Sequence, residues 1–153
     1  MKVFIDTNVI LEYVLQREHY AEAKKVIAQC ITAGDTMMMS AGGFYTMIFV
    51  VDKYFRKELL KGREEARELT RVIMRKILDV FSVAEHNVET LIIGIDNRTF
   101  YDLEDSCQYQ LAQKEGCKLL LTFNLADYPV EQTTTLSVMT PQMFIDTYLR
   151  IEM

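Results

Sequence analysis

The chain has 153 residues, a net charge of −5 and a hydrophobic fraction of 50%, so it is long enough to bury one substantial core but leaves no room for a second domain. We therefore expect a single domain over residues 1–153. The charge at Asp6 ends the first apolar run too early for a signal peptide, and no apolar run reaches the roughly 20 residues that cross a bilayer. We therefore expect a cytoplasmic protein without a membrane span.

The first part of the chain predicts two strands, each followed by a helix. Lys2 to Ile5 form a short apolar run that delivers Asp6 to the end of a strand, and Asn8 is the expected N-cap of the next helix. Residues 19–32 predict a helix that stops at Gly34. Residues 36–39 then predict a second strand, with Ser40 at its exit.

The middle of the chain is expected to be mainly helical. Residues 42–54 are strongly apolar, and their length favours a buried helix over a strand. Residues 63–78 predict an amphipathic helix, residues 80–83 a brief third strand and residues 87–95 a further helix.

The last part of the chain repeats the alternation. Residues 103–114 predict a helix that stops at Gly116, and the buried strand at 118–121 runs into Thr122. Residues 136–139 predict a last strand, and Thr140 caps a final helix with Pro141 at its first position. Strands that alternate with helices indicate an α/β fold with a mainly parallel central sheet covered on both faces.

Polar residues at the predicted strand ends are the first candidates for a functional site. In open α/β sheets the ligand site lies beyond the carboxyl ends of the strands, where this chain has Asp6 and Asp127. Asp105 opens a helix, and carboxylates from separate segments suit a hard cation such as Mg²⁺ or Mn²⁺. Taken singly, each acid is also explained as a helix cap, a dipole partner or a turn residue, so the hypothesis rests on their joint placement.

Four motifs in order resemble the PIN domain over almost the whole chain: Asp6-Thr7-Asn8-Val9, Ser40-Ala41, Asp102-Leu103-Glu104-Asp105, and Thr122-Phe123-Asn124 followed by Asp127-Tyr128. The resemblance implies a three-layer α/β/α fold, an acidic pocket for one or two Mg²⁺ or Mn²⁺ ions, and hydrolysis of RNA phosphodiester bonds. Many members of this family are toxins of toxin–antitoxin pairs, which implies an antitoxin-like partner.

Residue by residue, the resemblance makes Asp6 the first metal-ligating acid and Asp105 the third. Asp127 or Asn124 stands at the fourth position, and Asp102 is a lesser candidate. The side chains that would orient these ligands by hydrogen bonds are Thr7, Asn8 and Thr122.

The chain departs from the family pattern at Thr46. Most members place a metal-site glutamate about six residues after the serine that leaves the second strand, and here that position is Thr46. Loss of one carboxylate is expected to weaken cation binding, unless Thr46 instead holds a metal-bound water. Phe123 also stands where relatives often carry arginine, which removes one phosphate contact.

A basic stripe recurs every four residues in the helix predicted at 63–78: Arg63, Arg67, Arg71 and Arg75. One interpretation is a track for the RNA backbone. The other, which we favour from the sequence, is a solvated face with Glu64–Arg67 and Glu68–Arg71 pairs at i,i+3. Nearby aromatics could stack bases, although core packing is the preferred role of Tyr45, Phe49, Tyr54 and Phe55.

Three classes of function stay open. The first is a Mg²⁺- or Mn²⁺-dependent endoribonuclease with RNA as substrate. The second is a degenerate PIN-like module that binds RNA or protein without efficient catalysis. The third, an unrelated small α/β enzyme such as a phosphotransferase, is disfavoured because no phosphate-binding glycine loop occurs in the sequence. The apolar segment 44–51 suits a homodimer interface as well as the core.

Overall fold

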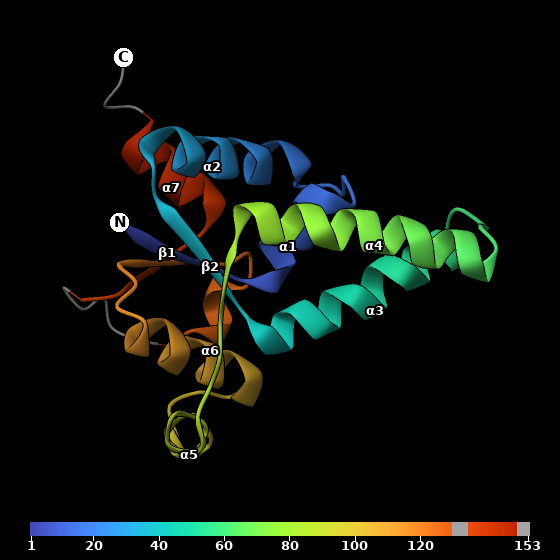
Figure 1. The fold of residues 1–153 in the computed structure, drawn as a ribbon. Helices are drawn as coiled ribbons and strands as arrows, with labels where there is room; N and C mark the ends of the chain where they lie inside the picture. Colours follow the sequence, from blue (N-terminus) through green and yellow to red (C-terminus); the bar gives the residue numbers. More distant parts are fainter. Residues whose placement is uncertain (130–134, 150–153) are drawn as a thin grey trace.

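The computed structural model describes residues 1–129 and 135–149 of the chain (Figure 1). Five strands form one sheet in the order β3-β2-β1-β4-β5, and every described neighbouring pair is parallel. Their bounds are β1 Lys2–Ile5, β2 Thr36–Ser40, β3 Ser82–Ala84, β4 Leu119–Leu121 and β5 Ser137–Met139. The chain builds β1, β2 and β3 toward one edge and then β4 and β5 toward the other, so the order reverses between β1 and β4, which is where α/β sheets bind ligands.

Alternating side chains of the strands enter two separate cores. Val3 and Ile5 belong to one cluster of buried residues, whereas Phe4 belongs to a second cluster on the opposite face of the sheet. Helices α1 (Thr7–Val14), α2 (Tyr20–Ala33) and α7 (Pro141–Tyr148) cover the first face. The second face is covered by α6 (Leu103–Lys114), with α5 (Val88–Asp96) packed against α6. This arrangement confirms the three-layer α/β/α fold.

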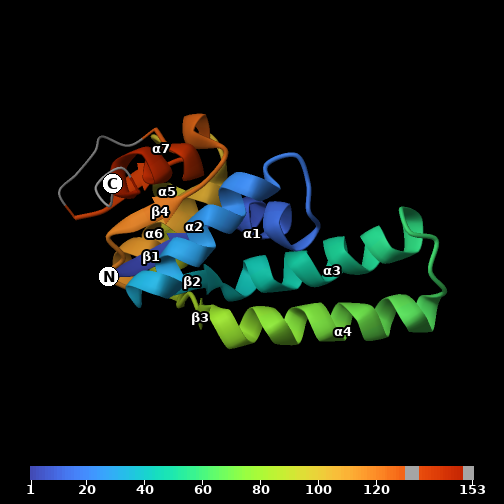
Figure 2. The same cartoon turned by 90° about the horizontal axis from the view of Figure 1, so that it is seen from above.

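Helices α3 (Ala41–Lys57) and α4 (Arg63–Val80) run side by side and extend away from the sheet as an arm (Figure 2). Because α3 begins directly after β2, the arm leaves the sheet at the same carboxyl edge at which β1 ends. The arm therefore projects from the edge that carries the polar strand ends.

The prediction that residues 42–54 form a buried helix is correct for the helix and wrong for its burial. Gly43, Met47 and Val51 are buried on one face of α3. On the other face, however, Tyr45 is 70% exposed and Phe49 is 63% exposed. The apolar composition of the segment is divided between two helix faces, and only one of them packs against the rest of the chain.

Element boundaries differ from the sequence predictions in two instructive places. The third strand starts at Ser82 and not at residue 80, because α4 continues through Val80. Helix α1 starts at Thr7, so Asp6 and not Asn8 occupies the N-cap position. Among the described residues, no helix is both long and apolar enough to span a membrane.

Helices α5 and α6 approach each other closely at Gly94. A Cβ atom on Gly94 would lie 2.7 Å from Cys107 Sγ and 2.9 Å from the Cys107 Cα. The Ser106 hydroxyl donates a hydrogen bond to the Gly94 carbonyl oxygen at 2.7 Å. These contacts fix α6, and with it Asp105, relative to the α5 layer.

Candidate active site at the carboxyl edge of the sheet

Neighbouring strands β1 and β4 bring Asp6 and Thr122 together. The Asp6 N–H donates to the Leu121 carbonyl oxygen at 2.9 Å, which continues the β1–β4 ladder past the end of the strand. The Thr122 hydroxyl donates to Asp6 Oδ2 at 2.9 Å. Although Asp6 stands at the N-cap position of α1, its side chain makes no capping hydrogen bond. A simple capping role therefore does not account for this buried carboxylate.

Asp105 reaches the same place from the first turn of α6. Gln108 Nε2 donates to Asp6 Oδ1 at 3.4 Å and to Asp105 Oδ1 at 3.2 Å. Tyr128 Oη lies 3.2 Å from Asp6 Oδ2 and 3.3 Å from Asp105 Oδ1, within hydrogen-bonding distance of both. The two carboxylates thus share both of these partners.

Asn8 ties the ends of β1 and β4 to each other. Its Nδ2 donates to Asp6 Oδ2 at 3.4 Å and to Thr122 Oγ1 at 3.3 Å. Its Oδ1 accepts a hydrogen bond from the Phe123 backbone N–H at 3.2 Å, and the Asn124 N–H donates to Thr122 Oγ1 at 3.0 Å. These bonds orient Asp6 in the way that the sequence predicts for Asn8 and Thr122.

Burial raises the pKa of both carboxyl groups, and neighbouring negative charges add to the shift of Asp105. Desolvation raises the pKa of Asp6, opposed by the hydrogen bonds from Thr122, Gln108 and Tyr128. Desolvation, followed by the charges of Asp6 and Asp102, raises the pKa of Asp105 to about 7. Two acids that are costly to ionise together form the kind of site in which a bound cation is favourable.

The other two predicted acids lie around this pair. Asp102 caps α6, since its Oδ1 accepts a hydrogen bond from the Asp105 N–H at 3.0 Å. Asp127 is exposed and ends the short helical turn η1 (Leu125–Asp127). The charges of both residues raise the pKa of Asp105, so both carboxylates lie within electrostatic reach of the buried pair.

The side chains of three predicted supporting residues, Thr7, Ser40 and Thr46, are directed to α3 and not to the two carboxylates. Ser40 caps α3, where its Oγ accepts from the Gly43 N–H at 2.9 Å. Thr7 faces the same turn, because a Cβ on Gly43 would lie 2.5 Å from Thr7 Oγ1. Thr46 is exposed, and its hydroxyl donates to the Gly42 carbonyl oxygen of its own helix at 3.2 Å.

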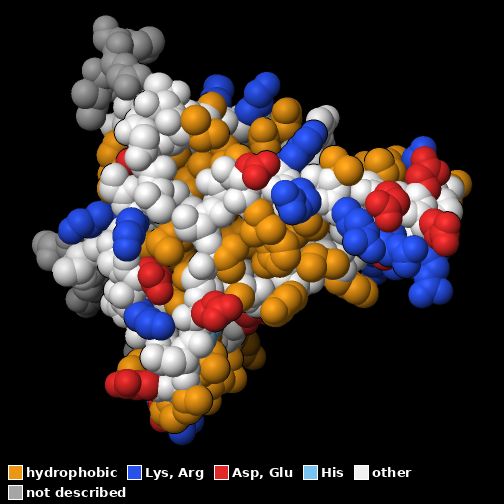
Figure 3. All heavy atoms as spheres, viewed as in Figure 1, with side chains coloured by type: hydrophobic (Ala, Val, Ile, Leu, Met, Phe, Trp, Pro, Cys, Tyr) orange, Lys and Arg blue, Asp and Glu red, His pale blue; other side chains and the backbone are white. Residues whose placement is uncertain are grey.

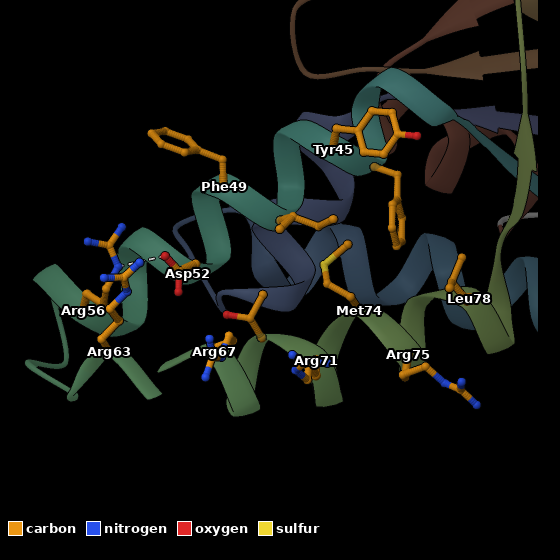
Figure 4. A pocket seen from close by; sticks show the side chains of 13 residues that line it. Tyr45, Phe49, Asp52, Arg56, Arg63, Arg67, Arg71, Met74, Arg75 and Leu78 are labelled. Carbon is orange, nitrogen blue, oxygen red and sulfur yellow. Dashed lines mark hydrogen bonds and ion pairs between the residues drawn. The ribbon is translucent and has the colours of Figure 1, made fainter. Parts of the chain in front are cut away.

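The four arginines of the predicted stripe lie on α4, in the arm, and not beside the acidic pair. Arg67 pairs with Glu64 at 4.0 Å and Arg71 pairs with Glu68 at 3.3 Å, which confirms the predicted i,i+3 pairs. The four arginines also line a hollow of about 1080 Å³ between α3 and α4 (Figure 4).

The exposed aromatic side chains of Tyr45 and Phe49 border this hollow. Hydrophobic side chains also gather between α3 and α4 on the face shown in Figure 3. The preference for core packing is therefore wrong for Tyr45 and Phe49, whereas Phe55 is buried and packs edge-on against the half-buried Tyr54.

The donor set of the acidic pair fits a cation that keeps some of its water. Mg²⁺ is commonly held by only one or two carboxylates together with waters and substrate phosphates, and Asp6 and Asp105 supply two converging carboxylates. The Gln108 Oε1 atom beside them is buried without a hydrogen-bond partner. Within residues 1–129 and 135–149, no three His, Cys, Asp or Glu side chains are placed to hold one metal ion, so the protein ligands are few.

Sequence reasoning did not identify Gln108 or the hydroxyl of Tyr128 as parts of this site. Gln108 follows Asp105 by three residues in α6, so a helical projection from the proposed acid would have placed it on the same face. Tyr128 was noted only as the aromatic that follows Asp127. Its position is set by the turn after β4, which periodicity does not predict.

Comparison with known proteins finds a matching family, a relative and solved structures of similar fold. Residues 2–126 match the PIN domain family. The chain is 30% identical to Ribonuclease VapC1 of Aquifex aeolicus (strain VF5) over 138 residues, which is 88% of this chain and 90% of that protein.

Solved structures with a similar fold include VapBC2 from Rickettsia felis bound to a DNA fragment from its promoter, with TM-score 0.61, 14% identity and coverage of 92% of this chain and 98% of that chain. VapBC-1 from nontypeable Haemophilus influenzae has a TM-score of 0.61 and 16% identity, and the match covers 93% of this chain and 99% of that chain. VapC20 from Mycobacterium tuberculosis, a toxin that cleaves the sarcin-ricin loop, has a TM-score of 0.56 and 12% identity. The match covers 86% of this chain and 98% of that chain.

Proposed function

The chain belongs to the PIN domain family, and on that premise we propose that it is a Mg²⁺- or Mn²⁺-dependent endoribonuclease and the toxin of a toxin–antitoxin pair. A relative that is 30% identical along most of both chains is a ribonuclease. RNA is therefore the substrate class that the comparison supports.

The observation that carries this proposal is the convergence of Asp6 and Asp105. They belong to different elements, yet each is buried and each accepts a hydrogen bond from Gln108. Asp6 makes no capping hydrogen bond to α1. Asp105 stands in the first turn of α6, but its place at the helix N-terminus does not account for its burial beside a second carboxylate, which raises its pKa. The two carboxylates are well placed to bind a divalent cation between them.

A bound divalent cation would supply positive charge to the phosphate oxygens and activate a water for attack. The chain's own groups prepare that site. Thr122 and Asn8 hold the Asp6 carboxylate in one orientation through its Oδ2 atom. Asp105 must lose its proton before it can ligate, since its pKa is about 7. Asp127, exposed at the edge, adds negative charge on the side open to solvent.

The arm offers a route for the RNA backbone to this site. Arg63, Arg67, Arg71 and Arg75 line the hollow between α3 and α4, and the arm starts at the sheet edge that carries Asp6. Exposed Tyr45 and Phe49 border the same hollow and are available to stack on bases. The Glu64 and Glu68 partners are themselves exposed, so phosphates can compete for the arginines.

A second candidate function is a PIN-like module that binds RNA or protein without efficient catalysis. The observation in its favour is Thr46, which stands where most relatives of this kind carry an acid and is bonded to its own helix. The first acid on α3 is Asp52, and it pairs with Arg56 at 2.8 Å. Asp6 and Asp105 would then be the main ligands of the cation, and Asp102 and Asp127 would mainly add negative charge.

We also propose an antitoxin-like protein as the partner, because two structures of similar fold are VapBC assemblies. A homodimer is a further proposal, supported by the exposed apolar side chains of α3 and α5, which include Tyr45, Phe49, Ile92 and Ile95. Light scattering of the purified chain, with and without its partner, measures both assemblies directly.

The two candidate functions are separated by measuring cleavage and binding on the same RNA set. Single-stranded and structured RNAs are incubated with Mn²⁺, Mg²⁺ or EDTA, and affinity is measured in parallel by fluorescence anisotropy. The nuclease predicts cleavage that requires metal and disappears in Asp6→Asn. Binding without cleavage above the level of Asp6→Asn would favour the second function.

A further inference from the structure

Gln108 is the one side chain amide that lies between the two buried carboxylates of the described site. It is 5% exposed. Its Nε2 lies 3.4 Å from Asp6 Oδ1 and 3.2 Å from Asp105 Oδ1. Its Oε1 is buried and has no hydrogen-bond partner, which is uncommon because most buried polar atoms in native proteins are paired.

The orientation of this amide suits a site without a cation. The NH₂ group is a donor and lies between two oxygens that accept hydrogen bonds, whereas an amide oxygen in the same place would face them unfavourably. A divalent cation between Asp6 and Asp105 would reverse this preference. Positive charge repels the NH₂ group and attracts a hard oxygen donor such as Oε1.

The exchange of the two amide atoms requires little movement. Oε1 and Nε2 change places through a half-turn about the last bond of the side chain, a soft torsion, and the backbone of α6 stays where it is. The same half-turn brings Oε1 to the cation and moves the NH₂ group to the buried place that has no partner, so it is favourable only when the cation contact outweighs that loss. It would also add a third protein oxygen to a site that has few.

We propose that Gln108 is a cation ligand that reverses its amide on binding: its NH₂ bridges Asp6 and Asp105 in the free protein, and its Oε1 contacts the cation in the loaded protein. The inference rests on the proposed function, since it requires the cation site. It assigns to Gln108 part of the ligation that Thr46 does not provide.

A purely structural role for Gln108 predicts the opposite change in affinity. If the amide only relieves repulsion between the carboxylates, it competes with the cation for them. Its removal would then leave Mn²⁺ binding equally tight or make it tighter. The sign of the change therefore distinguishes a ligand from a competitor.

The test measures Mn²⁺ binding by the electron paramagnetic resonance signal of free Mn²⁺, in wild type, Gln108→Met, Gln113→Met and Asp6→Asn. Methionine keeps the unbranched shape and removes both polar atoms. Gln113 lies on the same helix and is exposed, so Gln113→Met controls for the substitution itself. We expect Gln108→Met to bind at least tenfold more weakly and Gln113→Met to match wild type.

Equal or tighter binding by folded Gln108→Met would overturn the inference while leaving the proposed cation site intact. Failure of wild type to bind Mn²⁺, or equal binding by Asp6→Asn, would overturn the cation site and the inference with it. If Gln108→Met does not fold, a crystal structure of wild type with Mn²⁺, located by anomalous scattering, decides. A Gln108 oxygen about 2.1 Å from the ion supports the inference, and an ion without that contact refutes it.

Discussion

Asp6 and Asp105 share two hydrogen-bonding partners, Gln108 Nε2 and Tyr128 Oη, although Asp6 follows β1 and Asp105 lies in the first turn of α6. A proton or cation bound between the two side chains therefore affects the charge of both carboxylates.

The first consequence is a pH dependence of stability in the metal-free protein. The folded-state pKa of Asp105 is about 7, above its ordinary value of 3.8, so the folded state holds more protons than the unfolded state between these values. The contribution of Asp105 to the free energy of unfolding therefore falls as pH rises from about 4 to about 7.

Asp105→Asn removes that contribution and should raise the free energy of unfolding at pH 8 by on the order of 4 kcal/mol, with little effect at pH 3.5. Thermal melts in EDTA across this range measure the difference. Glu104→Gln, an exposed neighbour on the same helix, is the control. Equal melting shifts for Asp105→Asn at both pH values would contradict the assigned pKa.

The second prediction concerns Thr46, where the resemblance to the PIN domain leads us to expect an acid. Thr46→Glu adds a carboxylate at the family position and is expected to tighten Mn²⁺ binding on the order of tenfold, because affinity follows the number of charged oxygen ligands. Tyr45→Glu adds the same charge to the neighbouring position, which borders the hollow between α3 and α4. Equal effects of the two substitutions, measured by Mn²⁺ titration, would show that only net charge matters.

The third prediction concerns the arginines of the arm. If they contact RNA phosphates, replacement of Arg67 and Arg71 together by glutamine should weaken RNA binding and reduce the slope of log affinity against log salt by about 0.7 for each lost phosphate contact. Lys24 and Lys25 on α2 are exposed, and their double replacement by glutamine is the matched control. An unchanged slope would leave these arginines as a solvated helix face paired with Glu64 and Glu68.

The fourth prediction tests the packing that positions α6. Gly94→Ala places a Cβ within 2.9 Å of the Cys107 backbone, so we expect a loss of about 1–3 kcal/mol in stability. Gly42→Ala lies within helix α3 with nothing within 4 Å of the new Cβ, and should gain about 0.5–1 kcal/mol. Urea unfolding of both variants gives the comparison, and a neutral Gly94→Ala would mean that α5 moves away freely.

Sequence patterns predicted the element types well, because each depends on local periodicity. Helix α6 matched its predicted bounds from Leu103 to Lys114, where Gly116 with a φ of 72° supplies the stop. The burial of α3 was not predictable in this way, since apolar residues on both faces of a helix look alike in sequence. Which face is covered depends on the path of α4.

The same limit applies to the site. Asp6 and Asp105 were predicted as partners from their places after β1 and at the start of α6, and the structure brings them together. Gln108 and Tyr128 depend on side-chain directions across three elements, which no spacing rule supplies. That Thr46 departs from the family pattern stays a prediction, and the bond from its hydroxyl to the Gly42 carbonyl oxygen became visible only in three dimensions.

The most direct test of the central claim is a double-mutant cycle on metal-dependent RNA cleavage, with wild type, Asp6→Asn, Asp105→Asn and the double variant in Mn²⁺ and in EDTA. If the two carboxylates hold one cation, each single substitution should remove nearly as much activity as both together, because residues that act as a unit are strongly non-additive. Cleavage that survives Asp6→Asn, or that proceeds equally in EDTA, would contradict the account.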